Sequence, residues 1–325
     1  MADLRARTLR LPAIAALLLA FGTAAAAEDY PTRPVKIIVP FPPAALNDMV
    51  GRAIATSLTE RLGKQFIVEN RAGAGGTIGS ELAANAPKDG YTLLIVSLAS
   101  AVNRWLYPLT YDPDKSFAPI ASLVTTPAVV AVNADLPAKS LKELVALAKE
   151  KPGGVQYASS GVGTFLHLAG ELFKTSAGIN LLHVPFKGAG PAMINVIGGH
   201  TQAVFASVAS TSPHVKSGKL RALAVAADKR APALPDVPTA AEAGVPSYAA
   251  ANWIGIVAPA GTPEAIVNKL SKEISAALDS PELQKQFESR GAMTLRMNPA
   301  EFGAHMVAET EKWGRVVKAG GIKRE

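Results

Sequence analysis

The feature that most constrains the fold is an alternation of short apolar segments with amphipathic ones, which begins at residue 35. Residues 35–39 (VKIIV) have the pattern of a short buried strand, and residues 40–43 include three prolines that stiffen its exit. Asn47 then suits a helix N-cap and Asp48 its first turn, before apolar residues recur at helical spacing over residues 50–62. Such a strand–turn–helix unit directs free backbone amides beyond the end of the strand, where open α/β sheets bind small anions.

The same alternation continues through the chain and predicts an α/β fold. Further strands are expected at residues 65–70, 91–97, 156–159, 180–186, 201–205, 220–227 and 252–258. Further helices are expected at residues 77–86, 141–150, 165–178, 191–198, 263–278, 281–290 and 299–319. Residues 98–116 show few regular signals and are expected to wrap the surface, and residues 230–247 are expected to form a loop with a short helix.

One apolar, β-branched stretch at residues 118–133 is longer than a usual strand and can run from one lobe into another. The strand expected at residues 220–227 can carry the chain back. This organisation predicts two lobes with a ligand cleft between them, where strand-to-helix turns from both sides converge. The expected division is a discontinuous first lobe of residues 28–126 and 226–325, and a second lobe of residues 127–225.

The first 27 residues have the three parts of a secretory signal peptide. Three arginines precede an apolar core at residues 13–21, and Ala25 and Ala27 occupy the small-residue positions of a cleavage site. The apolar run is too short for a comfortable membrane span. We therefore expect cleavage near Ala27 and export of the mature protein to the periplasm.

Composition removes several classes of function. The chain has no cysteine, which excludes disulfides, thiolate metal ligands, a cysteine nucleophile and a lipid-modified N-terminal cysteine. The formal net charge of +7 includes three arginines and one aspartate of the signal segment, so the mature chain carries about +5. This excess is spread along the chain and aromatic content is only 6%. A nucleic-acid-binding surface would require a basic stripe with interleaved aromatics, so nucleic acid is not an expected partner.

A set of ordered motifs resembles one family over essentially the whole mature chain. These motifs are Tyr30-Pro31-x-Arg33-Pro34-Val35, Pro40-Phe41-Pro42-Pro43, residues 68–79 (VENRAGAGGTIG), residues 89–93 (DGYTL), residues 184–188 (VPFKG), residues 218–225 (GKLRALAV), residues 234–244 (LPDVPTAAEAG) and residues 258–263 (APAGTP). The chain resembles the substrate-binding proteins of tripartite tricarboxylate transporters, the Bug or TctC-like family. Eight ordered motifs make this match far more specific than any single glycine pattern.

The resemblance implies a type II periplasmic-binding-protein fold that closes on a small carboxylate. It also implies a membrane permease of one large and one small subunit as partner, and ligand contacts made largely by loop amides and ordered water. Two departures from the family pattern bear on the site. Ala44-Ala45 stands where members usually carry a glycine pair, which predicts a narrower or displaced pocket because alanine resists positive φ. Gln202 and Ala206 replace two expected acids, so ligand identity does not transfer from relatives.

The candidate ligand-binding residues follow from these turns. In the first lobe they are Phe41, Pro43, Ala44, Ala45, Asn47, Asp48 and Ser97. In the second lobe they are Ser159, Ser160, Gly161, Gly163, Thr164, His167, Phe186 and Lys187. Glycines let the backbone approach a ligand, and hydroxyls can donate to carboxylate oxygens.

Several of these candidates also have an ordinary structural role to weigh against ligand contact. Ala44, Ala45 and Asn47 can serve only the turn and the helix cap. Phe41 can simply pack at a strand end, and Asp48 can serve the helix dipole. His167 can be a hydrogen-bonded structural histidine, and Lys187 can be an exposed surface cation. For Asp48 and Lys187 the structural role is the more common outcome.

No catalytic, metal or cofactor motif accompanies this pattern. The glycine-rich residues 73–79 fail the dinucleotide fingerprint, because Ile78 stands where its third glycine is required. The five histidines show no metal-ligand spacing, and no nucleophile–base pair is evident. We expect a non-catalytic, monomeric protein without cofactor that captures a small carboxylate and delivers it to a permease. A ligand-sensing role or an exported α/β enzyme are the alternatives.

Overall fold

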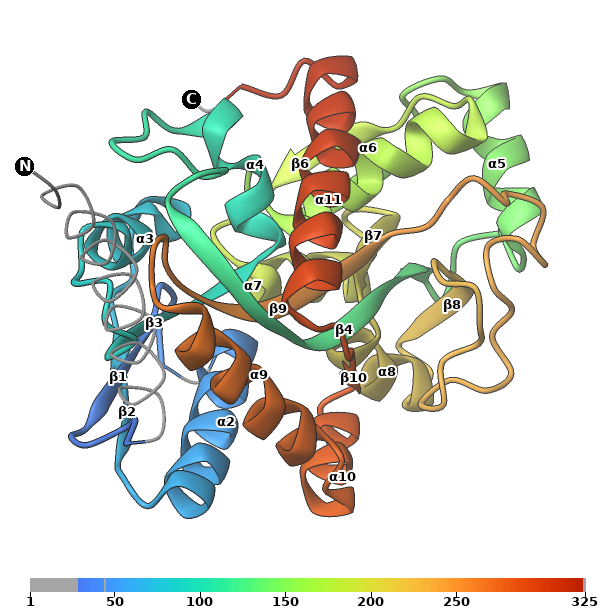
Figure 1. Ribbon diagram of the computed structural model, residues 1–325. Coiled ribbons are helices and arrows are strands. Elements are labelled where there is room, and N and C mark those ends of the chain that lie inside the picture. The colour runs from blue at the N-terminus through green and yellow to red at the C-terminus, as the bar shows by residue number, and fades with distance from the viewer. Residues whose placement is uncertain (1–28, 44, 324–325) are drawn as a thin grey trace, which may run out of the picture.

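The computed structural model describes residues 29–43 and 45–323, so the predicted signal peptide and Ala44 lie outside the described residues. Two lobes are joined by the long strand β4 (Phe117–Asn133) and by the segment that leads into β9 (Ala251–Pro259). In Figure 1 the first lobe holds the N-terminal elements and α9–α10, whereas the second lobe holds α5–α8.

The strands alternate with helices as the sequence predicts. The remaining strands are β1 (Val35–Val39), β2 (Phe66–Asn70), β3 (Thr92–Ser97), β5 (Gln156–Ser159), β6 (Leu182–Pro185), β7 (Ala203–Ser207), β8 (Leu220–Val225) and β10 (Met293–Thr294). The helices are α2 (Leu46–Leu62), the 3-10 turn η1 (Ala74–Gly76), α3 (Thr77–Ala84), α4 (Leu98–Leu106), α5 (Leu141–Glu150), α6 (Phe165–Ala177), α7 (Ala189–Ile197), α8 (Val208–Lys216), α9 (Glu264–Leu278), α10 (Pro281–Ser289) and α11 (Pro299–Ala319).

A continuous curled sheet runs through both lobes in the order β2-β1-β3-β9-β4-β7-β5-β6. Within each lobe the outer strands pair in parallel, β2-β1-β3 in the first and β7-β5-β6 in the second. Strand β4 is antiparallel to β9 up to Pro127 and antiparallel to β7 and β8 from Ala128 onward. One strand is therefore a member of both lobes, as the unusual length of the apolar stretch predicted.

The chain does not leave the second lobe when β8 ends. The Ala226 N–H donates to the carbonyl of Ala128 at 2.8 Å, and the Ala250 N–H donates to the carbonyl of Ala226 at 3.1 Å. Tyr248 is buried among second-lobe aromatics, with its ring centroid 5.1 Å from that of Phe173. Residues 226–250 thus pack on the second lobe, and no helix forms in this segment. The chain returns to the first lobe at the start of β9.

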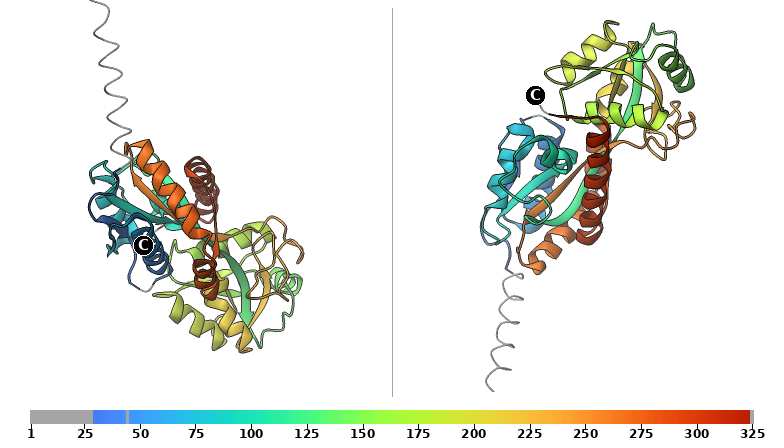
Figure 2. Two further views of the ribbon diagram at one scale, coloured as in Figure 1. Left: turned by 60° about the horizontal axis from the view of Figure 1, so that its bottom comes forward. Right: turned by 90° about the horizontal axis from the view of Figure 1, so that it is seen from above.

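Helix α11 packs across the junction of the lobes (Figure 2). Its buried Trp313 belongs to the apolar cluster that also holds Leu106 of the first lobe and Phe173 of the second. Gly314 allows close packing, because a Cβ there would lie 2.5 Å from the Trp105 ring of α4. The core therefore does not stop at the boundary between the lobes.

Residues 98–106 contradict the expectation of an irregular surface segment, because they form α4. Leu98, Ala101, Val102 and Leu106 are buried on one face of this helix, and their spacing is helical. The segment is only nine residues long and follows β3 without a loop, so its helical periodicity is difficult to separate from the pattern of the preceding strand. Among residues 29–43 and 45–323, no helix has both the length and the apolarity that a membrane span requires.

Candidate functional site

A cavity of about 200 Å³ lies between the lobes and is lined from both of them. First-lobe loops and α4 supply Phe41, Asn47, Gly75, Ser97, Leu98, Ala99, Asn103, Leu106 and Tyr107. The second lobe supplies Val162, Gly163, Thr164 and Phe165, and Asn252 stands where the chain returns to the first lobe. The carboxyl ends of β1, β3 and β5 thus meet at one cavity, as expected for α/β lobes.

Three helices begin at the wall of this cavity: α2 near Asn47, α4 at Leu98 and α6 at Phe165. The first turn of a helix leaves backbone N–H groups without intrahelical acceptors and carries the positive end of the dipole. The N-caps of α2 and α6, Ala45 and Thr164, make no side-chain cap, whereas Ser140 of α5 and Asn298 of α11 do. The N-cap side chains therefore do not occupy the first amides of α2 and α6. Helix α4 differs, because it begins with a capping box in which the Ser97 N–H donates to Ser100 Oγ at 3.4 Å.

The lining contains no lysine, arginine, aspartate or glutamate among the described residues. The positively polarised groups at its surface are therefore backbone N–H groups and side-chain amides. Asn47 Nδ2 is buried with no hydrogen-bond partner in the described chain. Asn103 Nδ2 instead donates to the Gly75 carbonyl at 3.1 Å, which fixes the glycine-rich turn against α4. A buried donor without a partner costs free energy that a bound acceptor would recover.

The lobes touch where the second-lobe turn meets α4. Gly163 has a φ of 75°, and a Cβ at this position would lie 2.3 Å from Leu106 Cδ1. Glycine is required here both for the left-handed backbone and for the close approach of the opposite lobe. The turn also folds on itself, since Thr164 Oγ1 donates to the Gly161 carbonyl at 2.8 Å.

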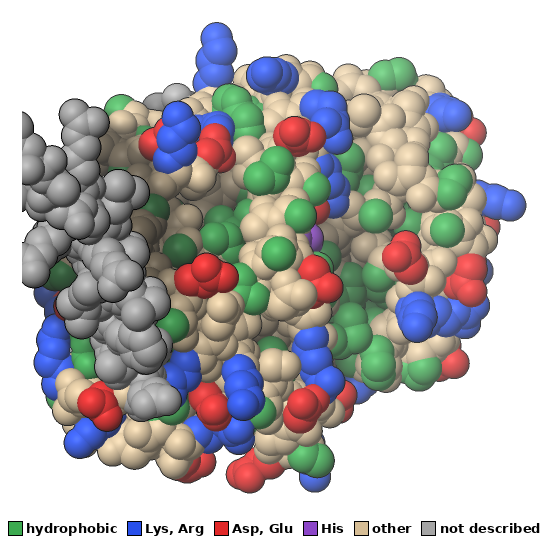
Figure 3. All heavy atoms as spheres, in the orientation of Figure 1, with side chains coloured by type: hydrophobic (Ala, Val, Ile, Leu, Met, Phe, Trp, Pro, Cys, Tyr) green, Lys and Arg blue, Asp and Glu red, His purple; other side chains and the backbone are tan. Residues whose placement is uncertain are grey.

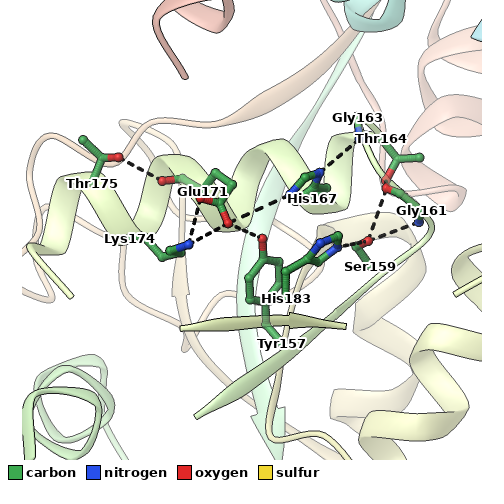
Figure 4. Close-up of polar contacts among 10 residues, drawn as sticks. All are labelled: Tyr157, Ser159, Gly161, Gly163, Thr164, His167, Glu171, Lys174, Thr175 and His183. Carbon is green, nitrogen blue, oxygen red and sulfur yellow. Dashed lines mark hydrogen bonds and ion pairs between the residues drawn. The ribbon is translucent and has the colours of Figure 1, made fainter. Parts of the chain in front are cut away.

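A buried polar network lies beneath this turn (Figure 4). His167 Nδ1 accepts the Gly163 N–H at 3.0 Å, and Ser159 Oγ accepts the Gly161 N–H at 3.1 Å. Ser159 Oγ also lies 2.6 Å from His183 Nε2. The two imidazoles stack in parallel with ring centroids 3.8 Å apart.

The deeper side of the network is charged. Glu171 accepts hydrogen bonds from Tyr157 Oη at 2.6 Å and from Lys174 Nζ at 2.9 Å. Burial lowers the pKa of His167 to about 3, with the neighbouring His183 and Lys174 adding to the effect. Burial also lowers the pKa of His183 and raises that of Tyr157. Both histidines are therefore neutral at ordinary pH.

The structure brings five of the predicted residues to the cavity wall: Phe41, Asn47, Ser97, Gly163 and Thr164. Four others lie just behind the wall. Ser159, Gly161 and His167 belong to the buried polar network. Asp48 accepts hydrogen bonds from Asn70 Nδ2 at 2.8 Å and from Arg52 Nε at 3.0 Å. Ala45 is the N-cap of α2. Pro43 and Lys187 are exposed, and Phe186 packs against the apolar cluster of the second lobe. None of these three lines the cavity, and neither does Ser160. Ala44 lies outside the described residues.

Sequence reasoning missed much of the wall contributed by α4 and the glycine-rich turn. Asn103, Leu106 and Tyr107 were missed because residues 98–116 were expected to be irregular. Gly75 belongs to a segment that was used as a family motif and tested as a dinucleotide fingerprint, but was not proposed to contact the ligand. Asn252 carries no local signal, since its position at the cavity depends on the pairing of Thr126 with it across β4 and β9.

Larger hollows in the described structure belong to the first lobe alone. One of about 590 Å³ is a polar groove between α9 and the turn before α11, and one of about 430 Å³ lies between α2 and α10. A more apolar hollow of about 260 Å³ separates α4 from α11. Figure 3 shows this face hollowed beside α11, with hydrophobic side chains in the recess. Only the 200 Å³ cavity, among these, combines both lobes with helix N-termini.

One serine–histidine pair does occur, although none was evident from the sequence. Ser159 is fully buried, its hydroxyl is engaged by His183 and Gly161, and it does not line the cavity. A nucleophile must reach its substrate, so this geometry suits a structural hydrogen bond. Within the described residues no group of three or more potential metal ligands comes together.

Comparisons with known proteins agree on one family. The sequence model described as "Tripartite tricarboxylate transporter family receptor" matches residues 50–322. Protein BugT of Bordetella pertussis is 36% identical over 320 residues, which cover 97% of this chain and 98% of BugT. The structure of R. palustris Rpa4515 with adipate is 35% identical with a TM-score of 0.79, covering 91% of this chain and 100% of that one. The periplasmic binding protein BugD is 36% identical with a TM-score of 0.75, covering 91% and 100%.

Proposed function

Because the chain belongs to the tripartite tricarboxylate transporter receptor family, we propose that it captures a small organic carboxylate between its lobes. The observation that carries this proposal is the meeting of three helix N-termini at one cavity that holds no charged side chain. Free amides and dipole ends favour an anion, and a neutral lining means that no built-in carboxylate competes with it. Adipate in the structural neighbour Rpa4515 supports the same chemical class.

We propose distinct roles for the amide groups and the aromatic side chains that line the cavity. The first-turn amides of α2 and α6, together with Asn47 Nδ2, hold carboxylate oxygens. Phe41, Tyr107 and Phe165 enclose the carbon skeleton, since aromatic walls bury apolar surface without adding charge. The Thr164 hydroxyl donates to the Gly161 carbonyl, so its proton is not available to a ligand. We therefore assign the ligand contacts of this turn to its backbone.

Capture requires the lobes to open. The two connections lie side by side, because β4 pairs with β9 at Pro127 and Ala251. We place the hinge there, which assigns residues 226–250 to the second lobe and moves the return crossing from the boundary expected at residue 226. A ligand that contacts both lobes favours the closed form in proportion to its differential affinity.

Capture without chemical conversion is the proposed outcome, because the buried Ser159–His183 pair has no access to the cavity. The family assignment supports a permease as the recipient of the ligand and the periplasm as the compartment. The predicted signal peptide fits export, and a monomer suffices because the cavity is completed by one chain. The enzyme and sensor alternatives have no observation in their favour.

A thermal-shift panel of mono-, di- and tricarboxylates, amino acids and aromatic acids tests this function. A ligand that binds only the folded state raises the free energy of unfolding by about 2.7 kcal/mol at a hundredfold excess over its Kd. The matched variant Asn47→Ala removes one donor, and the best ligand should bind it about fivefold more weakly. A flat response of the wild type to the whole panel would refute carboxylate capture, and chemical change of the bound compound would favour an enzyme.

A further inference from the structure

The side chains of the histidine network beneath the second-lobe turn do not line the cavity, so direct contact with a ligand does not explain them. It contains the buried His167 and Glu171, which are costly to bury, together with the partly buried His183 and Lys174. Its two outermost hydrogen bonds end on backbone N–H groups of the turn, those of Gly161 and Gly163. The network therefore acts on the backbone that faces the ligand.

The direction of the amides shows what this anchoring achieves. The N–H groups of Gly161 and Gly163 point inward to Ser159 Oγ and His167 Nδ1. Val162, which lies between them, lines the cavity, and its N–H is not one of the two amides that the network holds. Alternate amides of the turn are thus held inside, which leaves the intervening one available to the cavity.

The tautomer of His167 is determined by the same contacts. Nδ1 accepts a hydrogen bond from an N–H, so it must be unprotonated, and the ring proton lies on Nε2. Nε2 lies 3.9 Å from Glu171 Oε1, and Glu171 is itself held by Tyr157 and Lys174. At 3.9 Å this contact is too long for a hydrogen bond, so the carboxylate acts on the ring through its charge and the Gly163 N–H alone fixes the tautomer.

We propose that His167 is a positioning residue for the ligand, which presents the Val162 and Phe165 amides to the cavity by holding the Gly163 N–H. This inference rests on the proposed function. His167 does not line the cavity, and it acts through the turn. A turn that is ordered before binding avoids the entropy cost of ordering on binding, which raises affinity without a direct contact.

Variants of His167 separate positioning from general stability. Asparagine keeps an acceptor near the position of Nδ1, whereas leucine removes it. We expect His167→Leu to weaken binding of the best panel carboxylate about tenfold, and His167→Asn to restore most of that loss. His200→Leu, the same change at an exposed histidine of the same lobe, should leave the Kd unchanged. Isothermal titration gives the Kd, and thermal unfolding without ligand confirms that each variant is folded.

A ligand-free measurement tests the geometry directly. In ¹⁵N-labelled wild-type protein, a nitrogen–nitrogen coupling across the hydrogen bond should connect the Gly163 amide with His167 Nδ1. Equal Kd values for wild type and His167→Leu, or a protonated Nδ1 in the wild type, would overturn the inference and leave carboxylate capture standing. A wild type that binds no panel compound would instead refute the proposed function. Equal losses in His167→Leu and His167→Asn would also overturn positioning through an acceptor.

Discussion

Replacing Gly163 by alanine tests whether the contact between the lobes controls ligand affinity. Two costs arise from the structure. The φ of 75° imposes left-handed strain on alanine of about 1 kcal/mol, which is present whether the lobes are open or closed. The added Cβ would also lie 2.3 Å from Leu106 Cδ1, and this clash exists only when the lobes are together. Overpacking of this kind costs about 2 kcal/mol, which corresponds to a roughly thirtyfold rise in Kd.

The assay measures the Kd by titration calorimetry and the unfolding temperature without ligand. Gly178→Ala is the matched control, because Gly178 has a φ of 62° and nothing within 4 Å of an added Cβ. It carries the backbone strain alone, so it should lower stability while leaving the Kd unchanged. Leu106→Ala removes the clashing partner. The rise in Kd caused by Gly163→Ala should therefore be far smaller in a Leu106→Ala background than in the wild-type background. A Gly163→Ala protein that binds within twofold of wild type, or fully additive effects in the double variant, would refute the reasoning.

Two further predictions concern charge. Ala45→Asp caps α2 and should raise the free energy of unfolding by about 1 kcal/mol, yet weaken carboxylate binding at least tenfold because it places a negative charge at the anion site. Ala45→Ser, a neutral cap, is its control, and equal affinity of both variants would contradict the charge argument. Stability should fall as pH drops from 6.5 toward 3, because unfolded His167 takes up a proton that the folded form does not bind. Burial lowers the pKa of folded His167 to about 3, and His183 and Lys174 add to the effect, while Glu171 and Tyr157 also face the ring. Denaturant unfolding at pH 7.5 and 4.5 should show a loss about 2 kcal/mol smaller in His167→Asn than in wild type, and an equal loss would show that His167 is not buried as neutral imidazole.

The alternation of strands and helices was sufficient to predict the fold class, and the length of the apolar stretch at residues 118–133 predicted the strand that both lobes share. Local patterns predicted helices at residues 281–290 and 299–319 closely, because the residues that cap them, Ser280 and Asn298, directly precede them in the sequence. The packing of residues 226–250 on the second lobe has no such local cause. It depends on backbone hydrogen bonds between Ala226 and Ala128 that join segments far apart in sequence.

The candidate site shows the same division between local and distant causes. Asn47, Ser97 and Thr164 could be predicted because each stands at the junction of a strand and a helix in its own segment. Leu106 lies at the far end of α4 and reaches the cavity only because the second lobe packs against it at Gly163. No pattern within residues 98–106 could predict a contact made by the opposite lobe.

The alanine at position 45 also shows how the site avoids a requirement for glycine. Ala45 adopts φ −65° and ψ 159°, an extended conformation that any L residue accepts, so the strain expected from alanine at this position does not arise. Its small side chain makes no cap, and the first amides of α2 stay free. Glycine would leave the same amides free but would add flexibility to the unfolded chain and to the turn. Alanine therefore combines an uncapped helix end with a stiffer turn, as the proposed binding by backbone amides requires.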